Sequence, residues 1–336
     1  MAKIKKYFIF YIYKKIFLRY IGRVKKEVEA LTMKIGLVGL GKMGSNLALN
    51  LHDHGIDVVG CDPDEATRCK LSNEGVKSVA TFKELLQQLP QKKIIWLMVP
   101  SGAVTESCMD DAKHYLQEND IVIDGGNSNY KDSMRHYQAL KEKGIRFLDV
   151  GTSGGMSGAR NGACFMVGGS REAFDEMKDV FYSIAQKDGC MYTGKAGSGH
   201  FMKMVHNGIE YGMMQAIAEG FHVLEKSEFD YDLAQVADNW NHGSVIRGWL
   251  MELAKMQFSK HPGLKDIKGV VAASGEAKWT VETALEMEVP VPVIALSLMI
   301  RNASLEDDSF SCKVVSALRN GFGGHAYVEA GKEEQR

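Results

Sequence analysis

The sequence predicts an α/β domain of the Rossmann type followed by an all-α domain. Between residues 33 and 196, short apolar runs typical of buried strands alternate with segments of helical periodicity. Beyond Gly197 the strand patterns stop and long helical patterns take over. Alternating strands and helices indicate a parallel sheet covered by helices, and the helical run indicates a separate domain. The 336 residues provide enough chain for both.

Composition and charge narrow the class of protein. Hydrophobic residues make up 45% and charged residues 25% of the chain, as in ordinary globular proteins. The net charge of -1 combines a strongly basic segment at residues 1–32 with an acidic remainder, which offers no footprint for nucleic acid. The cysteines are scattered without Cys-x-x-Cys spacing, and no histidines cluster with them. We therefore expect free thiols in a reducing cytoplasm, and neither disulfides nor a metal site.

Residues 1–32 form a basic extension that we expect to be dispensable. Its apolar run at residues 7–13 is far shorter than the ~20 residues that span a bilayer. A basic amphipathic helix on a membrane surface is the alternative. Met33 opens the first strand pattern and would serve as a start. We expect a cytoplasmic protein without a membrane span, with a nucleotide-binding domain at residues 33–196 and a helical substrate-binding and dimerisation domain at residues 197–336.

A glycine fingerprint joins the first predicted strand, residues 33–38, to the first predicted helix, residues 45–54. Between them stand Gly39, Gly41 and Gly44 in the spacing Gly-x-Gly-x-x-Gly. These glycines suit a tight turn, close approach of a pyrophosphate, and close packing of the helix on the strand. The start of the helix then offers N–H groups and a positive dipole end to phosphates. The predicted cofactor contacts here are Gly39, Gly41, Met43 and Gly44.

Asp62 follows the second predicted strand, residues 57–61, at the distance expected for an acidic ribose-binding residue. A carboxylate accepts hydrogen bonds from the ribose hydroxyls and repels a 2′-phosphate. Pro63 stands where an arginine would be expected for NADP. Asp64 suits the N-cap of the helix at residues 65–73, which would leave Asp62 available for ribose. The sequence therefore predicts NAD, preferred over NADP.

Further strands bring more loops to the same sheet edge. Residues 94–99 and 120–124 are apolar strands, so Val99, Pro100 and Asn127 should border the cofactor. The strand at residues 146–150 is followed by a glycine- and serine-rich stretch, residues 151–159, that we interpret as a loop cradling an anion or hydroxyls. Strands at residues 163–168 and 187–192, with a helix at residues 171–185 between them, complete the predicted sheet.

The stretch 197–219 carries an unusual helix face. Lys203, His206, Asn207 and Glu210 lie at i, i+3, i+4 and i+7, which is one face of one helix. A solvated polar face is the ordinary explanation. Two features argue against a solvated face. The opposite side of the helix is not continuously apolar, and Gly208 and Gly212 suit close approach of another backbone or a ligand. The residue types alone leave a solvated face and a catalytic face equally open.

The rest of the second domain is predicted to be helical. The patterns cover residues 201–226, 231–239, 246–256 and a long helix at 278–303. Four basic residues stand out here and near the C-terminus: Lys278, Arg301, Arg319 and His325. Each one alone is more typical of a surface charge or a helix C-cap.

From residue 33 to 329 the sequence resembles the 6-phosphogluconate dehydrogenase family, the decarboxylating enzymes of the pentose phosphate pathway. The most specific stretches are residues 39–44, 124–128, 151–155, 203–211, 275–279 and 319–325. The helical region is about half that of long members, so the chain resembles the short, bacterial-type form. Asp62-Pro63 also departs from the Asn-Arg pattern of NADP-using members.

The resemblance implies oxidation of C3 of 6-phosphogluconate, loss of CO2 and reprotonation to ribulose 5-phosphate. It implies that Lys203 is the base and Glu210 the acid, with Asn207 also in the catalytic set. Removal from water would help the amine lose its proton and keep the carboxyl protonated. Protonated Lys203 could then stabilise the enolate.

The family's substrate contacts also map onto this sequence. The resemblance implies that Asn127, Ser153, Gly154, Gly155, His206 and Asn207 hold the carboxylate and hydroxyls. The phosphate would be bound by Tyr211, Lys278, Arg301, Arg319 and His325. Because Arg319 and His325 reach the neighbouring subunit in the family, we expect a homodimer or dimer-based oligomer with shared active sites. The chemistry needs no metal.

Two other functions remain alternatives. A β-hydroxyacid dehydrogenase of the 3-hydroxyisobutyrate type would share the glycine fingerprint and the Lys-x-x-x-Asn pair. It would have no need of Glu210 or of the phosphate-binding set. A non-catalytic NAD-binding sensor would keep the fingerprint but have little reason to place an acid and a base on one helix.

Overall fold

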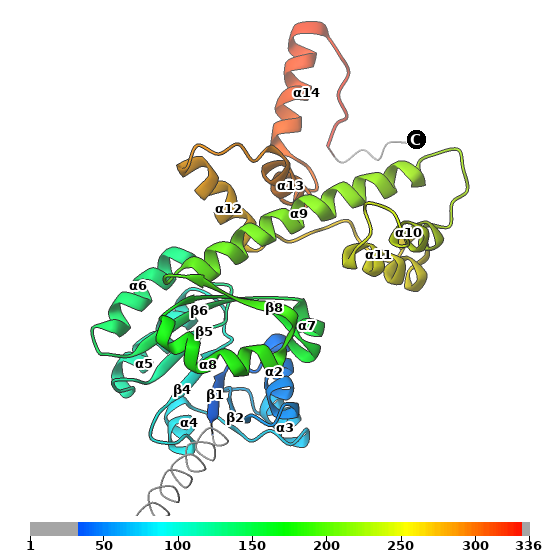
Figure 1. Ribbon diagram of the computed structural model, residues 1–336. Helices are drawn as coiled ribbons and strands as arrows, with labels where there is room; N and C mark the ends of the chain where they lie inside the picture. Colours follow the sequence, from blue (N-terminus) through cyan, green and yellow to red (C-terminus); the bar gives the residue numbers. More distant parts are fainter. Residues whose placement is uncertain (1–32, 331–336) are drawn as a thin grey trace, which may run out of the picture. The chain divides into compact units, whose positions relative to one another are not determined.

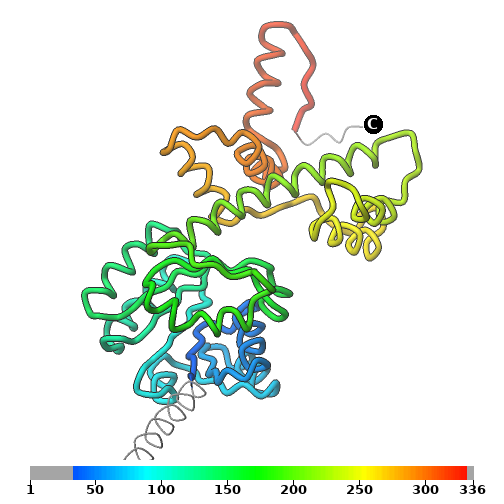
Figure 2. The backbone as a smooth tube through the Cα atoms, in the orientation of Figure 1, coloured from blue at the N-terminus to red at the C-terminus, as the bar shows by residue number. Residues whose placement is uncertain are grey.

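The computed structural model describes residues 33–330, so the basic extension predicted at residues 1–32 lies outside the described residues. The chain divides into two compact units, the first ending at Met204 and the second beginning at Val205. Figure 2 follows the backbone through the first unit, drawn in blue to green, and the second, drawn in yellow to red.

The first unit is built on an eight-stranded sheet with the order β3-β2-β1-β4-β5-β6-β7-β8 (Figure 1). All neighbours pair in parallel except β6 and β7, which are antiparallel. From β1 the chain adds β2 and β3 on one side and β4 to β6 on the other, so the strand order changes direction between β1 and β4. Open parallel sheets bind ligands at such a point, at the carboxyl ends of the strands. The strands are β1 Lys34–Val38, β2 Asp57–Cys61, β3 Ser78–Val79, β4 Ile94–Leu97, β5 Ile121–Asp124, β6 Arg146–Ser153, β7 Ala163–Gly169 and β8 Ala185–Gly194.

Helices cover both faces of this sheet, which explains why the central strands β1, β4 and β5 are continuous buried runs. One core includes Leu47 of α2 and Phe181 of α8. The other includes Leu85 of α4, Met109 of α5 and Leu140 of α6. The helices are α2 Lys42–Asp53, α3 Glu65–Asn73, α4 Phe82–Gln88, α5 Ala103–Tyr115, α6 Tyr130–Lys141, α7 Gly155–Asn161 and α8 Arg171–Ile184.

The second unit is helical, as predicted. The long helix α9, Ser198–Glu225, begins in the first unit and continues into the second. A small core of Phe221, Ala237 and Met251 joins it to α10 and α11. The remaining elements are α10 Leu233–Asn241, α11 Trp249–Lys260, the 3₁₀ turn η1 Pro262–Leu264, α12 Gly275–Glu286, α13 Pro292–Ala303 and α14 Phe310–Gly323.

Two predicted segments are wrong. The helix predicted at residues 278–303 is two helices, because Pro290 and Pro292 lack the N–H that an uninterrupted helix needs. The loop predicted at residues 151–159 is instead the end of β6 followed by α7. Antiparallel pairing with β7 continues to Ser153, opposite Cys164, and this extends the strand.

Two further expectations concern the state of the cysteines and the presence of a membrane-spanning helix. All six cysteines are free, as their spacing predicts. Within residues 33–330, none of the helices combines the length and apolar character that a membrane span requires.

Candidate active site

The glycine fingerprint forms a turn whose three glycines have different surroundings. Gly39 has φ +90°, and a Cβ there would lie 2.6 Å from the carbonyl oxygen of Met98. A Cβ on Gly44 would lie 1.9 Å from the carbonyl oxygen of Gly39, so the helix packs directly on the turn. Gly41 instead faces open space and caps α2 without any side-chain hydrogen bond. The exposed N–H groups of this helix start fit the pyrophosphate of a dinucleotide.

Asp62 is not left free, contrary to the expectation from sequence. Its Oδ2 accepts a hydrogen bond from the Leu40 N–H at 2.8 Å, and its Oδ1 accepts one from the Asp64 N–H at 2.9 Å. The carboxylate therefore ties the glycine turn to the end of β2. Each oxygen has further lone pairs, so the group can still accept from ribose hydroxyls. Asp64 caps α3 by accepting from the Thr67 N–H, as predicted.

Arg68 is a residue of this region that the sequence prediction missed. Its Nη1 donates to the carbonyl oxygens of Asp62 at 2.8 Å and Pro63 at 2.7 Å. The guanidinium thus braces the backbone that carries Asp62. The one signal for this role in the sequence is the position of Arg68, six residues after Asp62 and near the start of the next helix.

The loops after β4 and β5 lie against each other, as predicted for neighbouring carboxyl ends. A Cβ on Gly126 would lie 2.8 Å from the Val99 carbonyl oxygen. Pro100 and Asn127 are exposed, and Met43 at the start of α2 is half-buried. Next to Asn127, the Ser128 hydroxyl is buried, and among the described residues it has no hydrogen-bond partner. Ser128 belongs to the motif at residues 124–128, but its sequence context predicted no role for it.

The small residues after β6 adopt a special backbone. Ser153 is the last residue of β6, Gly154 has φ +115°, and Gly155 has φ +58°. Gly154 is the N-cap of α7 without a side-chain cap. The stretch therefore presents a short helix start at the carboxyl end of β6, in place of the predicted loop, and its role as a cradle for an anion or hydroxyls stays a prediction.

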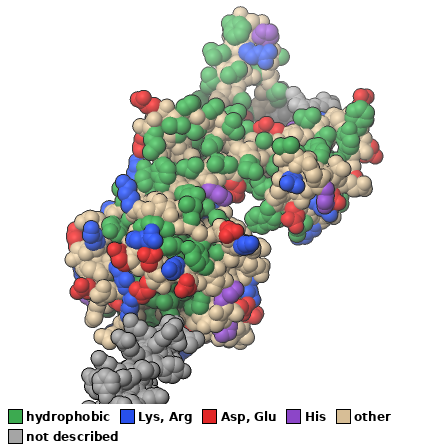
Figure 3. Space-filling view, viewed as in Figure 1, with side chains coloured by type: hydrophobic (Ala, Val, Ile, Leu, Met, Phe, Trp, Pro, Cys, Tyr) green, Lys and Arg blue, Asp and Glu red, His purple; other side chains and the backbone are tan. Residues whose placement is uncertain are grey.

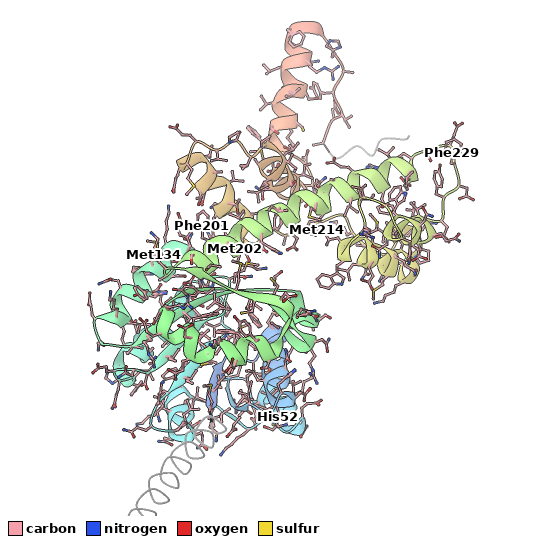
Figure 4. The ribbon with its side chains drawn as sticks, in the orientation of Figure 1. His52, Met134, Phe201, Met202, Met214 and Phe229 are labelled. Atoms are coloured by element: carbon pink, nitrogen blue, oxygen red, sulfur yellow. The ribbon has the colours of Figure 1, made fainter. Side chains whose placement is uncertain are left out.

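The start of α9 is fixed on β6 by a buried carboxylate. Asp149 is fully buried and accepts from the N–H groups of Gly197 at 2.8 Å and His200 at 3.0 Å. It supplies from a distant strand the cap that Gly197, lacking a side chain, cannot provide. Figure 4 labels Met134 of α6 and Phe201 of α9 beside this helix start. Asp149 was not predicted, because its partners lie far along the chain.

This docking places Lys203 close to the edge where the cofactor turn lies. A Cβ on Gly151 would lie 2.4 Å from the Lys203 Cβ, so only glycine lets α9 approach β6 there. Lys203 is 6% exposed. Gly151 is two residues from the carboxyl end of β6, and β1 ends at that same edge of the parallel sheet. Lys203 is therefore buried against β6, at the same edge of the sheet as the glycine turn.

The polar face of α9 continues in the second unit with His206, Asn207 and Glu210. Asn207 is 8% exposed, its Nδ2 donates to Glu276 Oε1 at 3.2 Å, and its Oδ1 lies 3.0 Å from His206 Nδ1. Glu210 lies 3.9 Å from His206 Nδ1 and is 40% exposed. The burial expected for Glu210 is therefore wrong for the chain alone, because α12 covers the helix at Asn207 and not at Glu210.

Part of the predicted phosphate-binding set comes together in the second unit. The Arg301 guanidinium stacks on the Tyr211 ring with 3.4 Å between its Cζ and the ring centroid. The Tyr211 hydroxyl accepts from the Ser274 N–H at 2.9 Å. Lys278 is 67% exposed and lies 3.6 Å from Glu282. Ser274 was not predicted.

Arg319 and His325 are not joined to that group. Arg319 lies on α14. His325 follows the end of this helix, and its carbonyl oxygen accepts a hydrogen bond from Asn320 Nδ2. Across residues 33–330, no hydrogen bond or ion pair links either residue to Tyr211 or Arg301.

Comparison with known proteins identifies the family. Residues 34–194 match the model of the NAD binding domain of 6-phosphogluconate dehydrogenase, and residues 199–313 match that of the 6-phosphogluconate dehydrogenase C-terminal domain. A putative 6-phosphogluconate dehydrogenase of Bacillus subtilis is 53% identical over 88% of this chain and 99% of the relative. An NAD(+)-dependent, decarboxylating 6-phosphogluconate dehydrogenase of Haloferax volcanii is 42% identical over 87% of this chain and 98% of its own length.

A solved structure supports the same assignment. The 6-phosphogluconate dehydrogenase of Plasmodium falciparum superposes with a TM-score of 0.74 and 31% identity, over 89% of this chain and 67% of that one. The matches cover both the sheet domain and the helical domain. The chain is an oxidoreductase that belongs to the 6-phosphogluconate dehydrogenase family.

Proposed function

We propose that this chain catalyses the oxidative decarboxylation of 6-phosphogluconate to ribulose 5-phosphate and CO2, with NAD as the hydride acceptor. The observation that carries the proposal is the buried amine of Lys203. The start of its side chain, Cβ and Cγ, packs against Gly151 near the carboxyl end of β6, on the helix that also bears Asn207 and Glu210. An amine base beside a dinucleotide turn, followed by an acid two turns along, suits dehydrogenation followed by proton return. The family membership supports the same reaction.

Lys203 begins the reaction as the base. Its neutral amine takes the proton of the C3 hydroxyl, and NAD, when bound, accepts the hydride from C3. The protonated amine then donates a hydrogen bond to the C3 carbonyl oxygen. As the bond between C1 and C2 breaks and CO2 leaves, the electron pair moves toward that carbonyl, and the ammonium stabilises the resulting enolate.

Glu210 completes the reaction as the acid. It lies seven residues after Lys203, a separation of roughly 10 Å along the helix axis. From there its carboxyl group protonates the carbon that lost CO2, which becomes C1 of ribulose 5-phosphate. This step leaves Glu210 ionised and Lys203 protonated, and transfer of that proton from the amine to the carboxylate through solvent restores both groups. Asn207, one helical turn after Lys203, holds substrate hydroxyls with its amide.

The preference for NAD over NADP rests on the charge at the end of β2. The Asp62 carboxylate would repel a 2′-phosphate, and Pro63 supplies no compensating cation. The nearby Arg68 spends Nη1 on two backbone carbonyls, which braces Asp62. The relative from Haloferax volcanii is named as NAD(+)-dependent, which agrees with this preference.

The substrate is expected to place its phosphate at Tyr211 and Arg301, with Lys278 nearby on α12. The guanidinium stacked on the Tyr211 ring donates from Nη1 to the Ala272 carbonyl oxygen at 3.3 Å and from Nη2 to Met214 Sδ at 3.9 Å, and its remaining N–H groups can donate to a phosphate. The remaining sugar contacts are Asn127, Ser153, Gly154, Gly155 and His206.

A second copy of the chain supplies Arg319 and His325 in a homodimer with shared active sites. The helix α14 that carries Arg319 has no buried residue, and it exposes Phe310 and Phe322 at 78% each. Figure 3 shows apolar side chains gathered on the surface of the second unit. Val293 of α13 is 64% exposed as well. A helix without buried residues gains stability only from a partner, which supports dimerisation through this unit.

The test is a panel of substrates and cofactors followed through NADH or NADPH formation. We expect activity with 6-phosphogluconate and NAD, and little with gluconate or NADP. Preference for NADP would remove the Asp62 argument and leave the chemistry standing. Turnover of 3-hydroxyisobutyrate in place of 6-phosphogluconate would assign the chain's activity to that class of dehydrogenase, and NAD binding without any turnover would indicate a sensor.

A further inference from the structure

A buried carboxylate of α12 faces the polar side of α9. Glu276 is 4% exposed, and its Oε1 accepts the hydrogen bond from Asn207 Nδ2 at 3.2 Å. Burying a carboxylate costs free energy unless its hydrogen bonds compensate for the lost water. A glutamate in this position therefore needs an explanation beyond packing, and its contact with Asn207 suggests one.

The hydrogen bonds around Asn207 allow only one orientation of its amide. The amide nitrogen of Asn207 faces Glu276 and donates its hydrogen bond to the carboxyl oxygen Oε1. The amide oxygen then faces His206 Nδ1 at 3.0 Å, and because this oxygen only accepts, Nδ1 must carry the proton. Turning the amide over would bring its oxygen against the carboxylate and lose both bonds.

We propose that Glu276 is a positioning residue for the substrate site: it fixes the Asn207 amide and, through that amide, the proton on His206 Nδ1. The neutral imidazole then has its lone pair on Nε2, so His206 offers an acceptor to a sugar hydroxyl. Glu276 itself acts through Asn207. This inference rests on the proposed roles of His206 and Asn207 in binding 6-phosphogluconate.

The packing of the second unit holds α12 close enough for this contact. A Cβ on Gly208, the residue after Asn207, would lie 2.9 Å from Thr280 Cγ2. Thr280 is one helical turn after Glu276 on α12, so the missing side chain at position 208 lets the two helices approach at the level of the carboxylate. A Cβ on Gly212 would meet Val293 Cγ1 of α13 at 3.2 Å, which is a second close approach on the same side.

The direct test is ¹⁵N NMR of the histidine ring nitrogens in the full chain, with the His206 signals assigned by their loss in His206→Gln. In the wild type above the ring's titration range we expect a protonated Nδ1 and an unprotonated Nε2. In Glu276→Gln, whose amide can donate as well as accept, both Asn207 orientations become possible, so we expect a mixture of the two ring tautomers. Glu286→Gln, an exposed glutamate at the end of the same helix, is the matched control and should leave the spectrum unchanged.

Kinetics give the second readout. We expect kcat/KM for 6-phosphogluconate to fall roughly tenfold to a hundredfold in Glu276→Gln, the range of a buried polar group left without its proper partner. The control should stay within twofold. A wild-type His206 with its proton on Nε2, or an unchanged ring spectrum and kcat/KM in Glu276→Gln, would overturn the inference. A wild type that lacks activity would instead overturn the proposed function, while the spectrum would still decide the role of Glu276.

Discussion

Lys203 and Glu210 differ in their surroundings as much as in their chemistry. The lysine is 6% exposed against β6, whereas the glutamate is 40% exposed on the same helix. In the reaction that we propose, Lys203 is the base and Glu210 is the acid. The chain itself buries the proposed base, whereas the proposed acid is shielded from water only when the substrate covers it.

Replacing Lys203 by Met keeps the size of the buried side chain and removes the base. We expect kcat to fall by about 10²–10⁴, the usual contribution of a positioned acid or base. Binding of NAD, followed by fluorescence titration, should be unchanged. Lys195→Met, at an exposed lysine just before α9, is the control. A Lys203→Met enzyme within tenfold of the wild-type kcat would show that another group is the base.

If Asp62 sets the choice of cofactor, as we propose, Asp62→Asn should weaken NAD binding selectively. We expect KM for NAD to rise roughly tenfold, because hydrogen bonds to a charged acceptor are about 1.5–3 kcal/mol each. The ratio of NAD to NADP efficiency should fall with it. Asp64→Asn alters the neighbouring cap of α3 and should leave the ratio unchanged. Equal changes for both cofactors in Asp62→Asn would mean that the residue only holds the turn to β2.

At the scale of elements, the first turn of α9 depends on a carboxylate from β6. Asp149→Ala would leave the buried N–H groups of Gly197 and His200 without their acceptor. We expect the free energy of unfolding to fall by roughly 2–5 kcal/mol, and kcat to fall more than KM rises, because Lys203 loses its position. Urea unfolding and steady-state kinetics measure the two effects.

The control for this change is Asp175→Asn on α8, whose carboxylate is exposed and pairs with Arg171 on its own helix. It should leave both the unfolding midpoint and kcat close to wild type. If Asp149→Ala loses stability while the kcat of the folded fraction is unchanged, Asp149 anchors the helix without positioning Lys203.

The helices α5 and α6 are joined by a carboxylate whose effect depends on pH. Hydrogen bonds from Arg135, and then from His136, lower the pKa of Glu106 from 4.5 to about 2. A carboxyl with a lowered pKa stabilises the fold above about pH 4.5, and this contribution is lost as the pH falls toward 2. The side chain is 39% exposed, so solvent screening reduces the contribution to about 1 kcal/mol.

Glu106→Gln should therefore be about 1 kcal/mol less stable than the wild type at pH 7. The difference should shrink steadily below pH 4.5, as urea unfolding across this range would measure. A difference that stays constant with pH would mean that Glu106 acts through packing and not through its charge.

The sequence predicted elements well where the signals are local. The bounds of β2 and α3 agree with prediction because an apolar run and the Asp64 cap mark them. The prediction of one long helix at residues 278–303 was wrong, because the helical periodicity of apolar residues on both sides of Pro290 was given more weight than the proline itself. Asp149 and Glu276 could not be predicted, because each acts on a partner about 50–70 residues away that only the folded chain brings near. The four polar residues of α9 lie on one helix, as predicted, because their spacing is a local signal.

At the scale of the whole molecule, we proposed that two copies of the chain complete each active site. If Arg319 acts on the neighbouring subunit, Lys203→Met and Arg319→Ala chains mixed and reassociated should form hybrids with one intact site. Random pairing predicts about a quarter of the wild-type activity from two inactive parents. The measurement is activity after denaturation and joint refolding, with each parent refolded alone as the control. No recovery above the parents would contradict the shared site.

The most direct test of the proposed reaction is the ratio of CO2 to NADH formed from 6-phosphogluconate labelled with ¹⁴C at C1. Decarboxylation coupled to oxidation predicts one labelled CO2 for each NADH at every time point, with ribulose 5-phosphate as the product. The ratio needs no assumption about which residue acts first. NADH formed without labelled CO2, or with a retained C1 in the product, would contradict the reaction proposed here and indicate a simple hydroxyacid dehydrogenase.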